Sequence, residues 1–395
     1  MSKDKLLTRD FGLVWLSHFF QQLSWALFVH LPSFLHDLGM SEAKIGLIFG
    51  VSAFAAVVVR PVIGPMLDRL GRTAMIHSGN VLNVASIFLH LTVTGITPWL
   101  YVIRILHGVA LAIAMSAFFT YGADVVPQSR RTQGLALFGV SGLFALSLAG
   151  VIGDVILKVA SFRELVIVAG AFAGLSLLMS LSLPERGPER PYNTKPSTFL
   201  SIIRHQALGP LWFMASGLAF GFAAYLTFLR TFVDDIGIGT VGRFFVAYGV
   251  TAILLRVFFG SLPDRIGPKR VLYPAIGSLS IGMLVLASSS SSTDLAVAGF
   301  FCGIGIGFSF PILFGMIISR APVTGRGSAT SVFTALNDVG LFVAGPVLGV
   351  IVTSFGYPSM FRFTAVTLVI VTLGFAFWDR LVVSDPDQRQ ATPLG

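Results

Sequence analysis

The sequence predicts an all-α polytopic membrane protein, with twelve transmembrane helices in two pseudo-symmetric six-helix bundles. Charged residues make up 11% of its 395 residues and hydrophobic residues 54%, whereas soluble domains carry about 25% charged residues. A helix needs about 20 apolar residues to cross the ~30 Å hydrocarbon layer. Backbone groups in lipid must bond within their own segment, so each apolar run of that length is predicted to be a helix. The runs are centred near residues 23, 56, 85, 111, 145, 173, 220, 252, 280, 306, 341 and 369.

A polar motif between the second and third apolar runs of each half indicates a duplication. The first copy, RPVIGPMLDRLGR, begins at Arg60, and the second, RVFFGSLPDRIGP, begins at Arg256. Two of the three arginines, both glycines and the aspartate of the first copy keep their register in the second, where Pro268 replaces the last arginine. A repeat of about half the chain is typical of transporters built from two related halves.

The longest polar interruption divides the chain in the middle. It runs from Pro184 to about Gln206 and contains four prolines, which indicates a linker. The other connections are short, so neighbouring helices are expected to run antiparallel. The predicted parts are an N-terminal bundle (1–183), a linker (184–207), a C-terminal bundle (208–380) and a tail (381–395).

The net charge of +9 would favour a nucleic-acid partner in a soluble protein, but here it is better explained by membrane orientation. Most basic residues fall in segments on one side of the predicted membrane, and the clear exceptions are Lys44, Lys158 and Arg163. The positive-inside rule assigns the basic side, with both termini, to the cytoplasm. The lipid bilayer is therefore an expected partner and nucleic acid is not.

The sequence also predicts neither a metal site nor a cofactor. Cys302 is the one cysteine, so an internal disulfide or a cysteine metal cluster is excluded. The first apolar run, from Phe11 to about Leu35, is longer than the core of a signal peptide and lacks a clear cleavage site, so it is expected to remain as a helix.

Two motifs resemble those of the major facilitator superfamily. The segment from Gly64 to Arg72, GPMLDRLGR, resembles the signature loop of that family, and RILHG, from Arg104 to Gly108, resembles its fourth-helix motif. With twelve helices and a central linker, the resemblance covers nearly the whole chain. It implies a secondary transporter that works by alternating access, acts as a monomer and lies in a bacterial inner or plasma membrane. Efflux-type members are the branch resembled, although no proline accompanies the glycines of the fifth run.

The resemblance implies a gate formed by the repeated loops. Asp68 is expected to face the positive end of a helix from the other half, and Arg69 and Arg72 to pair with acids such as Asp124. The alternative is a topogenic turn with solvated charges. The predicted gating residues are Gly64, Asp68, Arg69, Gly71, Arg72, Asp124, Gly260, Asp264, Arg265 and Gly267.

Three ionisable residues within the apolar runs are candidates for proton coupling. Each costs ~2.5–3.5 kcal/mol at membrane depth, so a functional role is the default hypothesis. Asp338 lies about eleven residues, or roughly 16 Å, into the eleventh helix, and its alternative role is a structural pair with an arginine. Arg104 could bind an anionic group, relay protons or form a structural salt bridge. His30 could titrate near neutral pH.

Further polar and aromatic residues are candidates for the substrate cavity. The first helix carries most of them at helical spacing, and first helices line the cavity in the resembled family. A histidine there could instead be solvated near the membrane surface. The candidates are His18, Gln21, Gln22 and Trp25 on the first helix, Tyr225 on the seventh and Asn337 on the eleventh.

The sequence contains no Walker loop, zinc-ligand spacing or catalytic triad pattern, so the chain is not expected to be an enzyme. Energy would come from an ion or substrate gradient. The preferred prediction is proton-coupled export of a small organic molecule. One alternative is uptake of a small solute by proton symport or by a uniporter. Another, from a different class, is a polytopic membrane sensor or enzyme without net transport.

Overall fold

The computed structural model describes residues 8–127, 131–185, 199–322 and 325–384, and every regular element within these ranges is helical. By length and composition, 10 of its helices could cross a membrane. The last of these spans, Ser328–Val382, is 55 residues long. It includes Gly356, whose φ of +79° is not helical, and thus joins the eleventh and twelfth predicted runs.

The first predicted run is a broken helix rather than a continuous one. It comprises α1 (Arg9–Ala26), the 3-10 turn η1 (Leu27–His30) and α2 (Leu31–Asp37). Pro32 lies in the first turn of α2, where a missing N–H does no harm, whereas the same residue inside a continuous helix would break it. The break places His30 at a bend.

The remaining helices follow the predicted runs, and two of them show clear start signals. Ser161 and Glu164 form a capping box at the start of α7, and Ser291 and Asp294 form another at the start of α13. The long helices are α3 (Glu42–Leu70), α4 (Arg72–Leu89), α5 (Pro98–Val125), α6 (Arg131–Val159), α7 (Phe162–Ser180), α9 (Gly209–Asp235), α10 (Gly242–Phe259), α12 (Pro268–Ala287), α13 (Ser292–Arg320) and α14 (Arg326–Ser384). The short ones are η2 (His90–Thr92), α8 (Phe199–Ile203), η4 (Gln206–Leu208) and α11 (Leu262–Ile266).

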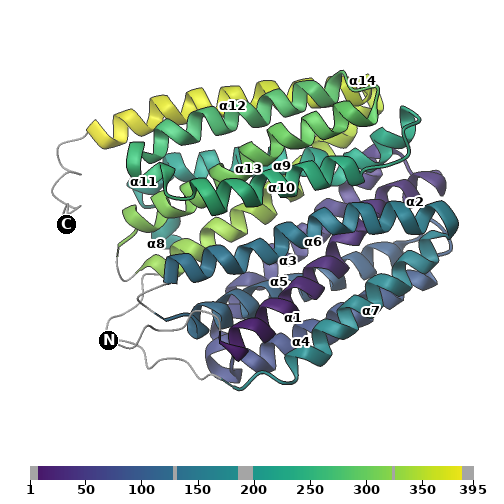
Figure 1. Ribbon diagram of the computed structural model, residues 1–395, viewed down its shortest axis with the longest axis horizontal. Helices are drawn as coiled ribbons and strands as arrows, with labels where there is room; N and C mark the ends of the chain where they lie inside the picture. Colours follow the sequence, from purple (N-terminus) through teal and green to yellow (C-terminus); the bar gives the residue numbers. More distant parts are fainter. Residues whose placement is uncertain (1–7, 128–130, 186–198, 323–324, 385–395) are drawn as a thin grey trace.

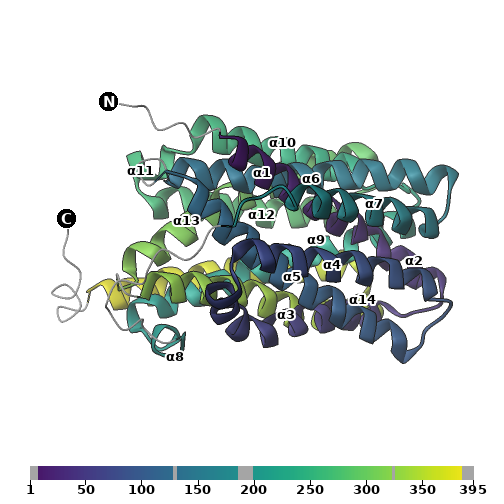
Figure 2. The same cartoon turned by 90° about the horizontal axis from the view of Figure 1, so that it is seen from below.

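The helices form two bundles, α1 to α7 and α9 to α14, which lie side by side (Figure 1). Most of the contact between them comes from α3, which packs against α14, and from α6, which packs against α10 (Figure 2). Helix α1 begins and α14 ends at one end of the molecule, on the left in Figure 1, and α2 lies at the other. These are called the terminal end and the far end below.

Glycines allow the paired helices to approach closely toward the far end. A Cβ at Gly46 on α3 would lie 2.0 Å from the carbonyl oxygen of Gly345 on α14, and a Cβ at Gly249 on α10 would lie 1.5 Å from Ser147 Oγ on α6. Small residues at such crossings let the backbones touch. Nearer the terminal end of α3, a Cβ at Gly64 would meet nothing within 4 Å.

Candidate functional site

A central pocket of about 50 Å³ lies between the bundles. Both bundles contribute to its wall, which is mostly apolar and includes two charged side chains, Arg104 on α5 and Asp338 on α14. The apolar residues in its wall include Trp25, Phe28, Phe49, Leu111, Leu226 and Leu341. The pocket is thus an apolar space with one acid and one base from opposite bundles.

Asp338 forms an ion pair that crosses from one bundle to the other. Arg60 Nε on α3 donates to Asp338 Oδ2 over 2.5 Å, and Arg60 Nη1 donates to Thr334 Oγ1 over 3.2 Å. The two charged side chains are 15% and 21% exposed. Charge-assisted hydrogen bonds of this kind are short and strong. The structural pairing with an arginine is therefore present, and it places the coupling candidate at the junction of α3 and α14.

Arg104 is 4% exposed, and no ion pair within the described ranges involves it. Its Nη1 lies 3.1 Å from His107 Nδ1, and its guanidinium lies 4.9 Å from the centre of the Phe49 ring. Because arginine can only donate, His107 Nδ1 must accept, and the ring proton of neutral His107 therefore resides on Nε2. Arg104 keeps its positive charge without an acidic partner.

The four first-helix candidates do not share one wall. His18 is buried within the N-terminal bundle, with Nδ1 2.7 Å from Ser141 Oγ and its ring stacked on Phe138 at 4.6 Å. Gln21 is also fully buried, and Gln22 Nε2 lies 3.2 Å from Met115 Sδ. Of the four, Trp25 lines the central pocket.

The remaining candidates lie elsewhere in the bundles. His30 is buried against α6, where a Cβ at Gly153 would lie 2.1 Å from His30 Nε2, and it lines a second pocket, together with Arg230. Tyr225 is packed among Phe222, Phe244 and Tyr248. Asn337 Nδ2 donates to the Phe333 carbonyl of its own helix over 2.9 Å.

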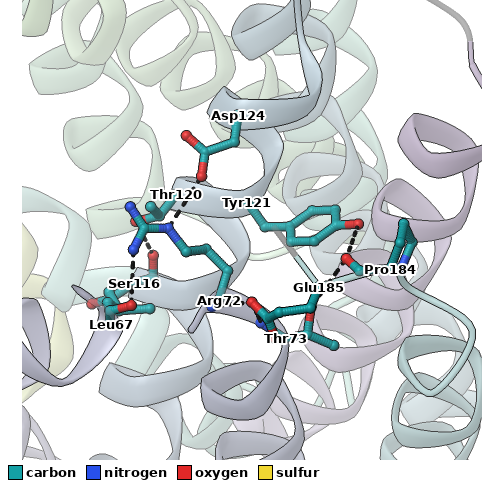
Figure 3. Close-up of polar contacts among 9 residues, drawn as sticks. All are labelled: Leu67, Arg72, Thr73, Ser116, Thr120, Tyr121, Asp124, Pro184 and Glu185. Atoms are coloured by element: carbon teal, nitrogen blue, oxygen red, sulfur yellow. Dashed lines mark hydrogen bonds and ion pairs between the residues drawn. The ribbon is translucent and has the colours of Figure 1, made fainter. Parts of the chain in front are cut away.

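At the terminal end, the first copy of the repeated loop is held inside its own bundle (Figure 3). Arg72 Nε lies 3.2 Å from Asp124 Oδ2, and Arg72 Nη1 donates to the Leu67 carbonyl over 2.8 Å. Glu185 Oε1 accepts the backbone N–H groups of Arg72 and Thr73 at 2.9 and 3.4 Å, so it caps the start of α4. These contacts connect α3, α4, α5 and the segment after α7.

Glycine is required at the turn between α3 and α4. Gly71 has a φ of +91°, and a Cβ there would lie 2.6 Å from Glu185 Oε1. Arg69 is exposed, while the side chain of Asp68, on which the expected contact with the other half depends, lies outside the described structure. Gly64 is part of α3.

The second copy of the loop has a different environment. Asp264 and Arg265 are exposed on the short helix α11. Gly260 caps α10, and Gly267, with a φ of +102°, makes the turn into α12. The ion pairs nearby involve neighbouring residues instead, since Asp379, fully buried near the end of α14, binds Lys269 and Arg320.

Sequence reasoning missed an ion pair that joins the bundles at the far end. Arg230 Nη1 on α9 donates to Asp154 Oδ1 on α6 over 3.0 Å and to the Gly239 carbonyl over 3.1 Å. Asp154 Oδ2 accepts the N–H of Gly242 over 2.6 Å, and Arg230 Nη2 also lies 2.9 Å from Asp234 Oδ1. The only signal was an acid and a base near the ends of two apolar runs.

Weaker polar contacts between the bundles accompany this pair. Ser33 Oγ donates to Asp234 Oδ2 over 2.6 Å, and Thr231 Oγ1 donates to Glu42 Oε2 over 3.4 Å. By contrast, the described ion pairs at the terminal end stay within one bundle. Apart from the Arg60–Asp338 pair beside the pocket, the described polar contacts between the bundles named here lie at the far end.

Comparisons with known proteins agree with this architecture. The sequence model of the Major Facilitator Superfamily matches residues 14–244 and 232–394. An uncharacterized MFS-type transporter of Pseudomonas aeruginosa is 25% identical over 344 residues, which is 84% of each chain. YhhS of Escherichia coli, also uncharacterized, is 24% identical over 87% of this chain and 85% of its own. The crystal structure of the nucleoside transporter NupG superposes with a TM-score of 0.74 at 14% identity, covering 94% of this chain and 99% of NupG.

The family model spans nearly all of the chain, and the solved structure shares its fold. The family to which this model belongs consists of membrane transporters and not of enzymes. The chain therefore belongs to the major facilitator superfamily of secondary transporters.

Proposed function

We propose that this chain exports a small organic molecule in exchange for protons and that Asp338 carries the proton. The main support is the ion pair between Arg60 and Asp338, which joins α3 to α14 beside the central pocket. A carboxylate in that position ties the bundles together when ionised and releases Arg60 when protonated. Proton binding is thereby linked to relative movement of the bundles, which is the requirement for alternating access.

The proposed orientation places the terminal end in the cytoplasm and the protein in a bacterial inner membrane. The distribution of basic residues supports this orientation. Since the polar contacts between the bundles, apart from the Arg60–Asp338 pair, lie at the far end, the conformation described would be closed to the outside. The two bundles, with predicted boundaries at 1–183 and 208–380, would move as a single-chain, monomeric carrier.

In this proposal the repeated loops act as the cytoplasmic gate. The contacts of Arg72 with Asp124 and of Glu185 with the start of α4 hold the first loop in a defined position on its own bundle. When the far end opens, the loops would approach the other bundle, where Asp68 and Asp264 can face helix termini. Their contacts would then stabilise the outward-open state.

The sense of proton movement tests the proposal directly. The purified chain is reconstituted into weakly buffered liposomes, and a compound that raises its unfolding temperature is added outside. Exchange acidifies the medium, because protons leave as the compound enters. Asp338→Asn should abolish the acidification, whereas Asp235→Asn, which removes an exposed acid, should retain it. Acidification that persists in Asp338→Asn would remove Asp338 from the mechanism.

Arg104 favours a second candidate, proton symport in the uptake direction. An anion bound to Arg104 beside Asp338 would disfavour the ionised carboxylate, so anion and proton would bind together and travel together. In the same assay symport makes the medium alkaline, and a uniporter leaves its pH unchanged. One measurement therefore separates export by exchange from both forms of uptake.

A further inference from the structure

The electrostatic balance at the central pocket is uneven. Of the two charged residues in its wall, Asp338 is neutralised by Arg60 at 2.5 Å, whereas Arg104 has no acidic partner in the described part of the chain. A buried charge without an opposite charge is costly. The pocket therefore has an excess positive charge that the protein itself does not neutralise.

Arg104 is nevertheless held in a defined position. His107, one turn further along α5, accepts from Nη1 at 3.1 Å, and the face of Phe49 lies 4.9 Å from the guanidinium carbon. A neutral imidazole and an aromatic ring orient a cation without cancelling its charge. Arg104 Nε is buried and has no hydrogen-bond partner, so a donor remains available to a ligand.

His90 is the neighbour of His107 in this part of the bundle. The two rings are 5.7 Å apart, and His90 Nδ1 lies 2.8 Å from the Ser86 carbonyl. Since a carbonyl only accepts, His90 Nδ1 carries a proton. The side chains behind Arg104 thus contribute polarity and no negative charge.

We infer that Arg104 binds the carboxylate of an anionic substrate and that the transported molecule is a small apolar organic acid. The apolar part would lie against Trp25, Phe28, Phe49 and Leu226, while the acid group would accept the free donors of the guanidinium. This inference rests on the proposed function in one respect, namely that the central pocket is the transport site. It holds for either direction of transport.

The test compares ligands that differ in charge alone. Thermal unfolding of the purified full-length chain is measured in detergent with benzoate, benzamide and benzylamine, and with 4-methylpentanoate and its amide. At concentrations well above Kd, a carboxylate should raise the unfolding temperature by a few degrees, and the matched amide and the amine should raise it less. Arg104→Gln should weaken carboxylate binding by about tenfold or more. Arg104→Lys, which keeps the charge but loses the planar donors, should retain part of the response.

Arg362→Gln, which removes an exposed arginine, is the matched control and should bind the carboxylates like the wild-type chain. Equal shifts from benzoate and benzamide, a preference for benzylamine, or no shift from either carboxylate would overturn the inference. So would a full benzoate response in Arg104→Gln. If that variant does not fold, the comparison of acid with amide in the wild-type chain decides alone.

This binding assay is independent of proton movement. A carboxylate-specific shift without any proton flux in liposomes would remove the proposed coupling and leave anion recognition in place. Substrate-dependent proton flux without a preference for carboxylates would remove anion recognition and leave the coupling.

Discussion

Among the residues that the structure describes, two ion pairs join the bundles, and their surroundings differ. In the far-end pair, Arg230 and Asp154 are 9% and 7% exposed, and backbone groups of Gly239 and Gly242 add further hydrogen bonds. In the pocket pair, Arg60 and Asp338 are 15% and 21% exposed, and the described additional partner is the hydroxyl of Thr334.

This difference indicates two roles: one ion pair stabilises a single conformation, and the other opens when its carboxylate is protonated. A buried pair held by several further hydrogen bonds is hard to open one residue at a time, because the charge left behind is poorly solvated. A partly exposed pair beside a pocket can be reached by water and protons, so protonation of one carboxylate can release it. The far-end pair is therefore suited to hold a conformation, and the pocket pair to respond to a proton.

The largest effect is expected from Arg230→Gln. Loss of the cation leaves Asp154 buried without its charged partner, which should destabilise the far-end-closed state by about 3–5 kcal/mol. The double variant Arg230→Gln with Asp154→Asn should recover much of this loss. Leu226→Cys, in a Cys302→Ala background, provides the readout, because Leu226 lines the central pocket. An impermeant maleimide applied outside should label this cysteine faster in Arg230→Gln. An unchanged labelling rate would contradict the role of the far-end pair in stabilising the closed conformation.

Gly46→Ala should have the next largest effect. Its new methyl group would collide with the Gly345 carbonyl oxygen at 2.0 Å, backbone that cannot move without separating α3 from α14. The expected loss is about 1–3 kcal/mol of stability, measured by thermal unfolding. Gly64→Ala, on the same helix but without a neighbour within 4 Å, is the control and should be neutral or stabilising by up to ~1 kcal/mol. Equal losses in the two variants would refute the close approach.

The coupling energy of the pocket pair should be smaller. A double-mutant cycle of Arg60→Gln and Asp338→Asn is expected to give about 1 kcal/mol, because the pair is partly exposed. The same cycle at Arg230 and Asp154 should give a clearly larger value. If the coupling energy of the pocket pair proved larger than that of the far-end pair, the roles assigned to the two pairs would be reversed.

The smallest effect is expected from Glu185→Gln at the terminal end. The carboxylate caps two N–H groups at the start of α4 (Figure 3), and an amide oxygen can still accept them, so the loss should be about 0.5–1 kcal/mol. Thermal unfolding gives the measurement, and labelling of Leu226→Cys should stay at the wild-type rate. Faster labelling would show that this contact, although confined to one bundle, acts on the far end.

Much of the fold could be predicted because it follows from local rules. The apolar runs and the repeated loop predict the family, which the sequence comparison confirms. The break in the first helix was not predicted, although Pro32 was a visible signal for it. The last two predicted runs are two helices within α14 that meet at the non-helical residue Gly356.

The site was harder to predict, because a membrane helix can be apolar on all faces. Asp338, Arg104 and Trp25 do line the central pocket, but His18 on the first helix packs against Ser141 and Phe138 of its own bundle, and Gln21 is buried outside the pocket wall. Without an amphipathic pattern, spacing alone does not tell which face meets the other bundle. The ion pair between Asp154 and Arg230 was missed because charges near the ends of apolar runs resemble ordinary boundary residues.

The sequence by itself determined the class of protein, the repeat and the family, because these depend on run length, composition and motifs that are local in the chain. Tertiary structure alone decided the partners of the charged side chains. Arg60 and Asp338 are 278 residues apart and Arg230 and Asp154 are 76 apart, and packing between bundles brings each pair together. Tertiary packing also places Arg104 beside His107 and not beside an acid. This arrangement underlies the inferred substrate class.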